Sequence, residues 1–245
     1  MSAQEGASSP PVADYLPPPR HSLRGVYHEL LMRLTYDIWQ REIRRFSRWP
    51  SDRPSRILEC GCGPGFLLRF LENWFLGAEF VGLDLDEQLL DSACERTTHA
   101  GFVRGSAEEI PLADATFDLL ITLHMVEHLP QPLRFIAEAR RVLRPGGLLI
   151  VATPNPVGIG AKVMGKRWSG WKDESHVALN PPHYWRTLIS SHGFTVLKDG
   201  TTGLSGIPVF RTLPMALLNW GPLFLFGFFP WMSGEAYVCI ATVDE

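Results

Sequence analysis

The sequence contains few cysteines, only four in 245 residues. Cys60 and Cys62 are separated by one residue within a glycine-rich stretch, which is too close for a comfortable disulfide bond. Four cysteines are also too few for a disulfide framework, so we expect reduced thiols and a cytoplasmic protein. A metal site at the Cys-x-Cys sequence is disfavoured, because no partner pair stands at zinc spacing.

An excess of one charge is also absent, since 23 Lys and Arg residues face 26 Asp and Glu residues, for a net charge of -3. There is therefore no electrostatic reason to expect a nucleic acid as partner. One local basic cluster consists of Arg41, Arg44, Arg45 and Arg48, spaced largely along one side of a helix. A solvated helix face explains this cluster, and a phosphate or lipid-headgroup patch is the alternative.

The start of the sequence lacks the basic region and apolar stretch of a signal peptide. Residues 1–20 are rich in proline, and we expect a disordered tail there. Residues 21–50 carry apolar residues at helical spacing and predict an N-terminal helical cap that ends near Pro50. Residues 51–245 are then expected to form one domain.

From residue 56 onward, short apolar runs alternate with amphipathic helical patterns. Such alternation is typical of a parallel sheet that is covered on both faces. The predicted fold is α/β, a Rossmann-like doubly wound sheet that is mostly parallel with a terminal antiparallel strand, plus the N-terminal helical cap. The predicted strands are residues 56–58, 80–83, 102–103, 117–123, 148–152, 194–197 and 236–242.

Two segments interrupt the alternation. Residues 154–181 are rich in glycine and tryptophan and show little periodicity, which predicts an excursion over the sheet that could close as a lid. Residues 205–234 form a hydrophobic excursion, and residues 212–234 contain no charge over a length close to the ~20 residues that span a bilayer. Three interpretations stay open: a hairpin that roofs the active site or a lipid-like substrate, peripheral membrane contact in one leaflet, and a full span, which the prolines disfavour.

The residues from Glu59 to Gly65, Glu-Cys-Gly-Cys-Gly-Pro-Gly, follow the first strand and open the first helix. Glycine suits a tight turn whose backbone comes against a ligand. A dinucleotide fingerprint would have its third glycine at position 66, where Phe66 stands. Glu59 would repel a pyrophosphate but attract the ammonium of an amino acid, and Asp84, which closes the second strand, can accept hydrogen bonds from both ribose hydroxyls. The pattern predicts an adenosyl ligand without a pyrophosphate.

Several segments together resemble the motifs of class I S-adenosylmethionine-dependent methyltransferases. They are residues 59–65, 81–84 (Val-Gly-Leu-Asp), 105–111 (Gly-Ser-Ala-Glu-Glu-Ile-Pro) with Phe117-Asp118 after it, and 143–147 (Leu-Arg-Pro-Gly-Gly). The resemblance covers about residues 56–155 and implies S-adenosyl-L-methionine as the cofactor. Family members usually carry Asp where this chain has Ser106, so the adenine amino contact would fall to a backbone group, to Ser106 or to Glu108.

The resemblance also implies a role for each residue of the cofactor site. Glu59 and the glycine turn would hold the methionine moiety, Asp84 the ribose, and Leu85 would pack on the adenine. The cofactor-binding residues expected on this basis are Glu59, Gly61, Cys62, Gly63, Gly65, Asp84, Leu85, Ser106, Ala107, Glu108, Leu123 and His124.

The fourth strand ends in Leu-His-Met-Val-Glu-His-Leu-Pro-Gln-Pro, residues 123–132, which resembles the same stretch of the quinone-pathway O-methyltransferases. In those enzymes an acid usually stands at position 124, and the acid, Glu and His have been associated with a divalent metal. Here that set would be His124, Glu127 and His128. Because Glu127 and His128 also recur in relatives as helix-start and packing residues, we expect no metal ion.

His124 is the candidate general base, since a neutral imidazole near pH 7 can accept a proton from a hydroxyl or amine. Simple packing on the cofactor is the alternative role, because alignment of acceptor, methyl carbon and sulfur supplies much of the acceleration. His176, in the expected lid, is the second catalytic candidate, and His183 is a further one. Tyr27 and Tyr36 are candidates for covering the cofactor, with a plain core or surface role as the alternative.

These patterns together predict an enzyme that transfers the methyl group of S-adenosyl-L-methionine to a small, lipophilic acceptor. Transfer to oxygen is favoured over carbon or nitrogen. A nicotinamide-dependent oxidoreductase is one alternative, against which Phe66 counts. The other is a non-catalytic adenosyl-binding partner or scaffold protein, because this fold hosts many functions.

Overall fold

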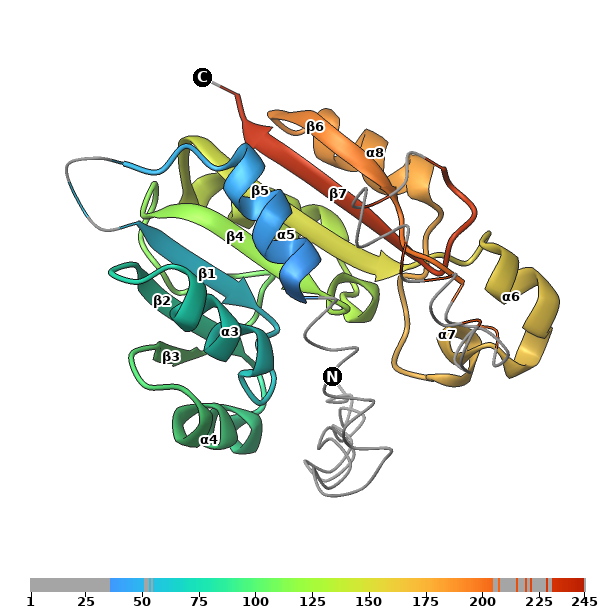
Figure 1. Cartoon of the computed structure of the whole chain (residues 1–245), viewed down its shortest axis with the longest axis horizontal. Coiled ribbons are helices and arrows are strands. Elements are labelled where there is room, and N and C mark those ends of the chain that lie inside the picture. Colours follow the sequence, from blue (N-terminus) through green and yellow to red (C-terminus); the bar gives the residue numbers. More distant parts are fainter. Residues whose placement is uncertain are drawn as a thin grey trace, which may run out of the picture.

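A computed structural model describes residues 36–50, 53, 55–204, 207, 215, 219, 221, 228 and 231–244. They form a seven-stranded sheet with helices packed against both faces (Figure 1). The predicted tail of residues 1–20, the first part of the 21–50 cap with Tyr27, and most of the 205–234 excursion lie outside the described residues. Within the described part, no helix is both long enough and apolar enough to cross a membrane.

The strand order is β3-β2-β1-β4-β5-β7-β6. Strands β1 to β5 pair in parallel, whereas β7 runs antiparallel between β5 and β6. The predicted mostly parallel sheet with its antiparallel last strand is therefore confirmed. The strands are β1 Arg56–Cys60, β2 Glu79–Asp84, β3 Gly101–Arg104, β4 Phe117–Leu123, β5 Leu143–Pro154, β6 Phe194–Thr201 and β7 Ala236–Val243.

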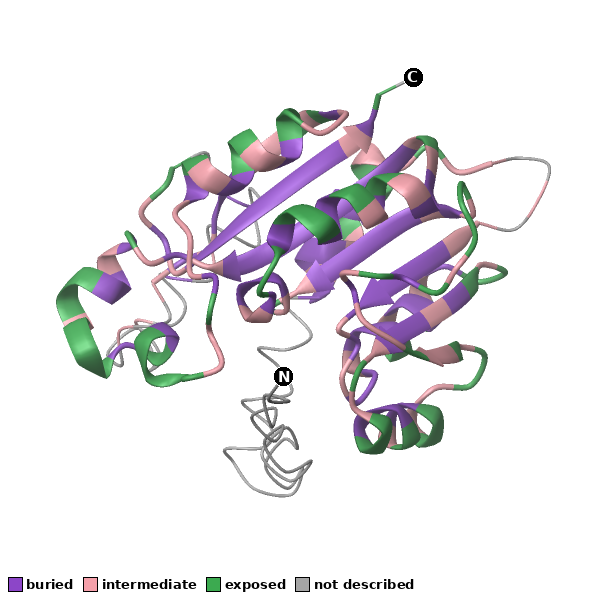
Figure 2. Cartoon of the chain, turned by 180° about the vertical axis from the view of Figure 1, so that it is seen from behind, coloured by how far each residue is buried: buried purple, intermediate pink, exposed green. Residues whose placement is uncertain are grey.

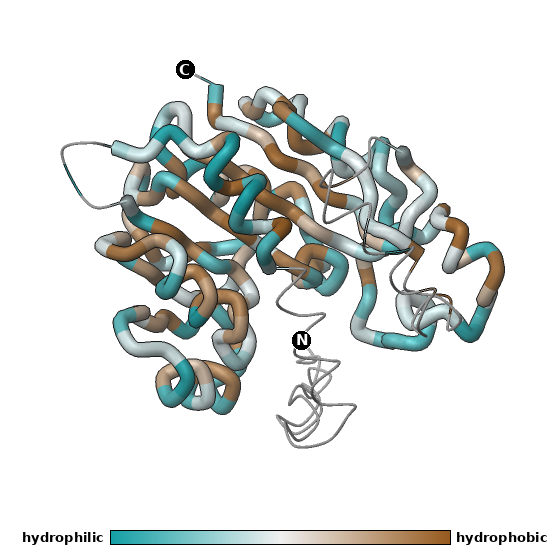
Figure 3. Tube along the Cα trace, in the orientation of Figure 1, coloured by the Kyte–Doolittle hydropathy of each residue, from teal (hydrophilic) through white to brown (hydrophobic). Residues whose placement is uncertain are grey.

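Two hydrophobic cores lie on opposite faces of the sheet. Successive residues of a strand point to opposite faces, and in β4 Leu119 joins one core while Leu120 joins the other. The first core is covered by a helix over residues 36–46 and by α3 (Phe66–Trp74), the second by α5 (Pro132–Val142) and α8 (Pro182–Ser190). The central strands β1, β4, β5 and β7 are accordingly mostly buried and apolar, whereas the edge strands β3 and β6 are partly exposed (Figures 2 and 3). Helix α4 (Glu87–Arg96) connects β2 to β3.

The helix over residues 36–46 is the described part of the predicted cap, and it lies flat against the sheet. Ile38, Trp39 and Ile43 are buried in the first core. Tyr36 is also buried, with its ring centroid 4.5 Å from that of Phe70. This part of the cap therefore forms a layer of the fold.

The fifth strand is longer than residues 148–152, because β5 begins at Leu143 and includes the Pro-Gly-Gly sequence. The pairing with β4 shifts between Phe117 opposite Leu143 and Leu119 opposite Leu148. Gly146 has φ of 73° at this shift. The expected turn before the strand is thus a β-bulge within it, where the extra residues are absorbed without ending the pairing.

The segment predicted as a lid, residues 154–181, contains three short helices, α6 (Ile159–Met164), η2 (Gly165–Arg167) and α7 (Ser169–Lys172). They lie beyond the carboxyl end of β5 and not across a face of the sheet (Figure 1). The backbone N–H of Ile159 donates a hydrogen bond of 2.8 Å to the carbonyl of Ser233, which ties α6 to the segment before β7. Helices this short show no 3.6-residue period, so the sequence pattern could not reveal them.

Candidate functional site

The glycine turn after β1 lies beside the carboxyl end of β2. The backbone N–H groups of Gly61 and Cys62 both donate to the carbonyl of Leu83, at 2.8 and 3.1 Å. The N–H of Gly63 donates to Oδ2 of Asp84 at 2.8 Å. The structure thus brings the turn and the strand-end carboxylate together at the edge of the sheet where α/β proteins bind ligands.

Two glycines of this turn have positive φ but different surroundings. At Gly61 (φ 71°) an added Cβ would lie 2.5 Å from Cγ of Met125, so the protein itself fills that side. At Gly63 (φ 49°) an added Cβ would meet nothing within 4 Å. Gly65 (φ 74°) precedes α3, and no side chain caps that helix. The turn therefore leaves open space beside Gly63 and uncapped amides at the start of α3, which suits an anionic group of a ligand.

Glu59 is the buried acid of the site, with 4% of its surface exposed. Its Oε2 atom is buried and has no hydrogen-bond partner among the described residues. Burial raises the pKa of Glu59 well above its usual value; the Leu68 backbone N–H opposes this shift, and the nearby Asp84 carboxylate adds to it. A buried carboxylate oxygen without a donor is costly. A ligand ammonium would satisfy it, so the residues present fit the predicted amino-acid moiety.

The loop after β3 carries the residues expected near the adenine. Its start is held beside β2, because the N–H of Gly105 donates to the carbonyl of Asp84 at 3.0 Å. The hydroxyl of Ser106 accepts a hydrogen bond from the N–H of Glu108 at 3.1 Å. Oε1 of Glu108 accepts one from the N–H of Gln131 at 2.5 Å. Both side chains thus shape the loop itself and connect it to the start of α5.

The other expected cofactor contacts differ in exposure. Leu85 follows β2 and is 63% exposed, so its side chain is free to pack on a ligand. Cys62 and Ala107 are buried, and Leu123 is partly buried. Burial raises the pKa of the Cys62 thiol, with the Glu59 and Asp84 carboxylates adding to the shift, so this thiol stays neutral.

His124 directly follows β4 and has φ of 55°, which is uncommon for a residue other than glycine. Its N–H donates to the carbonyl of Ala152 at 2.8 Å. Its side chain is 58% exposed, and Nδ1 lies 3.6 Å from Oε1 of Glu127. Desolvation lowers the pKa of His124, but the Glu127 carboxylate, with a further contribution from Glu235, outweighs it and the net pKa is raised. The strained backbone thus presents an accessible imidazole at the carboxyl edge.

Glu127 lies fully buried in η1 (Val126–His128), and its carboxylate connects the two catalytic candidates. Thr153 donates its hydroxyl to Oε2 of Glu127 at 3.1 Å. Oε1 of Glu127 lies 4.0 Å from Nε2 of His176 as well as beside His124. The structure therefore brings His124 and His176 around one carboxylate. His183 is exposed on α8 and takes no part in this arrangement.

Comparison with known proteins identifies the class of the domain. Residues 58–151 match a family model described as a methyltransferase domain. Over these residues the chain is similar to that family. The resemblance to class I S-adenosylmethionine-dependent methyltransferases is confirmed.

Two of the curated proteins that are similar to this chain are methyltransferases. A Probable S-adenosylmethionine-dependent methyltransferase of Mycolicibacterium smegmatis is 35% identical over 101 residues, which are 41% of this chain and 38% of the relative. A Ubiquinone biosynthesis O-methyltransferase of Parvibaculum lavamentivorans is 34% identical over 104 residues, 41% of this chain and 40% of the relative. The chain thus spans less than half the length of these relatives.

A solved structure extends the likeness in fold beyond the methyltransferase domain. An S-adenosylmethionine dependent methyltransferase from Mesorhizobium loti aligns with a TM-score of 0.62 at 18% identity, covering 85% of this chain and 99% of that one. Identity this low shows the shared fold alone. It confirms the Rossmann-like architecture across most of the chain.

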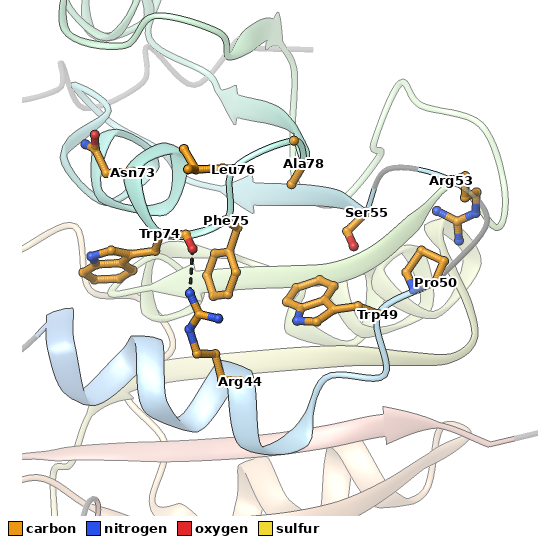
Figure 4. A pocket seen from close by; sticks show the side chains of 11 residues that line it. Arg44, Trp49, Pro50, Arg53, Ser55, Asn73, Trp74, Phe75, Leu76 and Ala78 are labelled. Atoms are coloured by element: carbon orange, nitrogen blue, oxygen red, sulfur yellow. Dashed lines mark hydrogen bonds between the residues drawn. The ribbon is translucent and has the colours of Figure 1, made fainter.

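A hollow of about 490 Å³ lies at the opposite edge of the methyltransferase domain, where β1 and β2 begin (Figure 4). Arg44 donates to the carbonyl of Trp74 at 2.7 Å there, and its guanidinium lies 5.0 Å from the ring centroid of Phe75. Arg44 of the basic cluster is therefore engaged within the protein. Because parallel sheets bind their ligands at the carboxyl ends of the strands, we do not place the functional site in this hollow.

Sequence reasoning missed the polar network that joins residues 173–176, in the 154–181 segment, to η1. Oγ of Ser175 lies 2.9 Å from Nδ1 of His128, and it donates to Oδ1 of Asp173. The N–H of Ala178 donates to the carbonyl of Glu127 at 2.8 Å. The Asp-Glu-Ser-His sequence at 173–176 was the available signal, but its distance from η1 along the chain hides the partner.

Proposed function

We propose that this chain binds S-adenosyl-L-methionine and transfers the methyl group to an oxygen of a small, lipophilic acceptor. The main support is the unpartnered, buried Oε2 of Glu59 at one end of the glycine turn. The open space at Gly63 and the Asp84 carboxylate tied to that turn complete the site. A cationic amino-acid moiety and a ribose match these features in charge and in hydrogen bonding.

Each part of the cofactor has a binding partner in this proposal. Glu59 pairs with the ammonium, while the uncapped amides of the first turn of α3 favour the carboxylate. Asp84 accepts from the ribose hydroxyls. The adenine packs on exposed Leu85, and Ser106, Ala107 and Glu108 border its edge.

When bound, S-adenosyl-L-methionine supplies a methyl group on a positively charged sulfur, open to in-line attack by an acceptor lone pair. His124 accepts the proton of the acceptor hydroxyl on Nε2, while its Nδ1 faces Glu127. Leu123, the residue before it, would contact the cofactor. The side chain of His176 is only 10% exposed. His176 therefore acts on the reaction through Glu127.

A lipophilic acceptor is supported by the uncharged residues 212–234. One described residue of this segment, Phe228, packs in the core with its ring centroid 4.7 Å from that of Trp39. The uncharged composition of this segment favours an acceptor that is itself lipophilic or is taken from a membrane surface. The four free cysteines support a reducing compartment such as the cytoplasm.

Calorimetric titration with S-adenosylmethionine and S-adenosylhomocysteine tests the cofactor claim. We expect micromolar binding that falls about 10–100-fold in Asp84→Ala, because hydrogen bonds to a charged group contribute about 1.5–3 kcal/mol. Asp91→Ala, on the exposed face of α4, is the matched control and should bind like the wild type. No binding of either ligand to folded wild-type protein would refute the proposal.

Transfer itself is tested with methyl-labelled cofactor and a panel of quinols, catechols and lipid phenols. Label in an ether-linked product supports O-methylation. Cofactor binding without transfer to any acceptor class would instead favour the non-catalytic adenosyl-binding protein. Binding of a nicotinamide cofactor in place of the adenosyl ligand would favour the oxidoreductase.

A further inference from the structure

A second surface of the molecule, outside the proposed cofactor site, carries the basic cluster found in the sequence. Arg41, Arg44 and Arg45 are exposed on the helix over residues 36–46, and exposed Arg48 follows it. These four residues are the arginine face. We propose that the arginine face, together with the hollow beside it (Figure 4), docks on an anionic lipid surface.

Two arginines of this face keep their positive charge without an acidic neighbour. Arg44 donates to a backbone carbonyl, that of Trp74, and its guanidinium lies over the ring of Phe75. The guanidinium of Arg45 lies 5.3 Å from the ring centroid of Phe46. Among the residues that the structure describes, neither guanidinium has a carboxylate partner. Both are therefore available to an anion at the surface, and the planar guanidinium group suits phosphate oxygens.

Acidic groups are scarce around the arginine face. The described helix contains two acids, of which Asp37 lies in its first turn and Glu42 is buried. Glu42 pairs with Lys198 at 2.5 Å and so does not offset the charge of the face. The described residues that line the hollow include Arg44 and Arg53 but no Asp or Glu. The local charge is therefore positive, although the chain as a whole has a net charge of -3.

The hollow adds side chains that suit the boundary between water and lipid. Leu76, in the turn after α3, is 87% exposed, more than any other large hydrophobic residue of the described part. Trp49 lies across the hollow, with its ring centroid 5.3 Å from that of buried Phe75 (Figure 4). A single exposed leucine is ordinary on a protein surface. Beside arginines and a tryptophan, however, it gives the composition of an interfacial membrane contact.

The surroundings of the helix favour a lipid surface over an acidic protein or a nucleic acid. On its buried side, Trp39 packs against Phe228 of the uncharged segment 212–234, with ring centroids 4.7 Å apart. The arginine face is thus carried by a helix that also holds part of a hydrophobic segment. Basic side chains attract anionic headgroups, while neighbouring apolar side chains insert below them. A nucleic acid offers Leu76 no apolar phase.

Docking at this surface leaves the proposed cofactor site accessible. Helix α3 follows Gly65 of the glycine turn and ends at Trp74, which lines the hollow. The two sites therefore lie at opposite ends of α3. A chain held at a membrane surface would meet a lipophilic acceptor at a raised local concentration. This consequence rests on the proposed function, whereas the docking itself does not.

Vesicle flotation of the full chain tests the proposal, with phosphatidylcholine vesicles that contain or lack phosphatidylglycerol, at low and at high salt. We expect binding to the anionic vesicles, weakened by salt because exposed charges are screened. Arg44→Gln/Arg45→Gln should lower the partition coefficient by about fivefold for each arginine removed from an anionic surface. Arg44→Lys/Arg45→Lys keeps both charges and should retain most of the binding. Leu76→Ser should lower the partition coefficient about tenfold and leave its salt dependence unchanged.

Arg134→Gln/Arg140→Gln is the matched control, because it removes the same charge from exposed positions of α5, which covers the other core. It should bind vesicles like the wild type. If Arg44→Gln/Arg45→Gln does not fold, Leu76→Ser tests the same surface at an exposed position.

Equal vesicle binding by the two arginine-to-glutamine double variants, or no binding of the folded wild type, would overturn the proposal. Binding of the wild type to polyglutamate but not to anionic vesicles would indicate an acidic protein as the partner and would overturn it as well. S-adenosylhomocysteine titrations of the same variants should match the wild type. The docking and the cofactor proposals can therefore fail independently of each other.

Discussion

The backbone N–H of Gly63 donates a hydrogen bond of 2.8 Å to Oδ2 of Asp84 and so couples the glycine turn after β1 to the end of β2. Asp86 donates its own N–H to the other oxygen, Oδ1, at 3.0 Å. Each carboxylate oxygen keeps a free lone pair. The glycine turn and the Asp84 carboxylate, which are proposed to hold the methionine moiety and the ribose, are therefore oriented by one hydrogen bond.

Alanine at two glycines of the turn should have different effects. Gly63→Ala places a methyl group in open space, so we expect about 1–2 kcal/mol of destabilisation from its positive φ, together with loss of S-adenosylmethionine binding. Gly61→Ala adds a clash with Met125 and should destabilise by more. Denaturant unfolding and calorimetry on both variants check this. Unimpaired cofactor binding by Gly63→Ala would argue that the open space is not the ligand site.

Glu59→Gln should change stability and binding in opposite directions. Because burial raises the pKa of Glu59, its ionised form destabilises the ligand-free protein, and this loss grows as pH rises toward and through the raised pKa. The variant should therefore gain about 1 kcal/mol in free energy of unfolding at pH 8 and lose about tenfold in S-adenosylmethionine affinity. Urea unfolding and calorimetry measure the two effects. A loss of stability with unchanged affinity would contradict the assigned role.

His124→Ala should lower kcat by about 100-fold or more if the imidazole accepts the acceptor proton. Cofactor affinity should change less than about threefold, because the charged and polar contacts to the cofactor are proposed for Glu59, Asp84 and the glycine turn. Steady-state kinetics with the best acceptor, with His183→Ala as control, measures the effects on kcat and on cofactor affinity separately. Equal loss of kcat and cofactor affinity would favour the alternative in which His124 only packs on the cofactor.

Asp118 should stabilise the fold at neutral pH and lose this contribution in acid. Its side chain is 9% exposed; burial opposes ionisation, but hydrogen bonds from Arg53 and the backbone of Arg56, with Arg144 nearby, lower its pKa. The contribution is complete above the unfolded-state pKa and disappears as pH falls through the lower folded-state pKa. Asp118→Asn should therefore lower the free energy of unfolding by about 2 kcal/mol at pH 7. This difference from the wild type should disappear below about pH 4.

Urea unfolding of wild type and Asp118→Asn between pH 3 and 8 measures this gap. Asp114→Asn is the control. Asp114 pairs with Arg141, but its side chain is 75% exposed, so this ion pair should contribute under about 1 kcal/mol to the free energy of unfolding. A gap between wild type and Asp118→Asn that is constant with pH would show that the carboxylate charge is not the source of the stability.

The proximity of the residues proposed for the cofactor could be predicted because they lie at or after the ends of neighbouring strands. Glu59, the glycine turn and Asp84 follow from β1 and β2, which pair directly, so their proximity in space follows from the βαβ rule. The grouping of the proposed catalytic residues could be predicted only in part. His124 follows a clear strand, whereas the partner of Glu127 in the 154–181 segment depends on short helices without a sequence period.

The sequence by itself determined the alternation of buried strands and amphipathic helices, the glycine turn, and the acidic residues at the ends of β1 and β2. These are local consequences of side-chain period and backbone freedom. Only the tertiary structure decided that β7 is inserted between β5 and β6, and that His176 stands beside Glu127. Those contacts join residues far apart in the chain, and packing of the whole core selects them where no local propensity can.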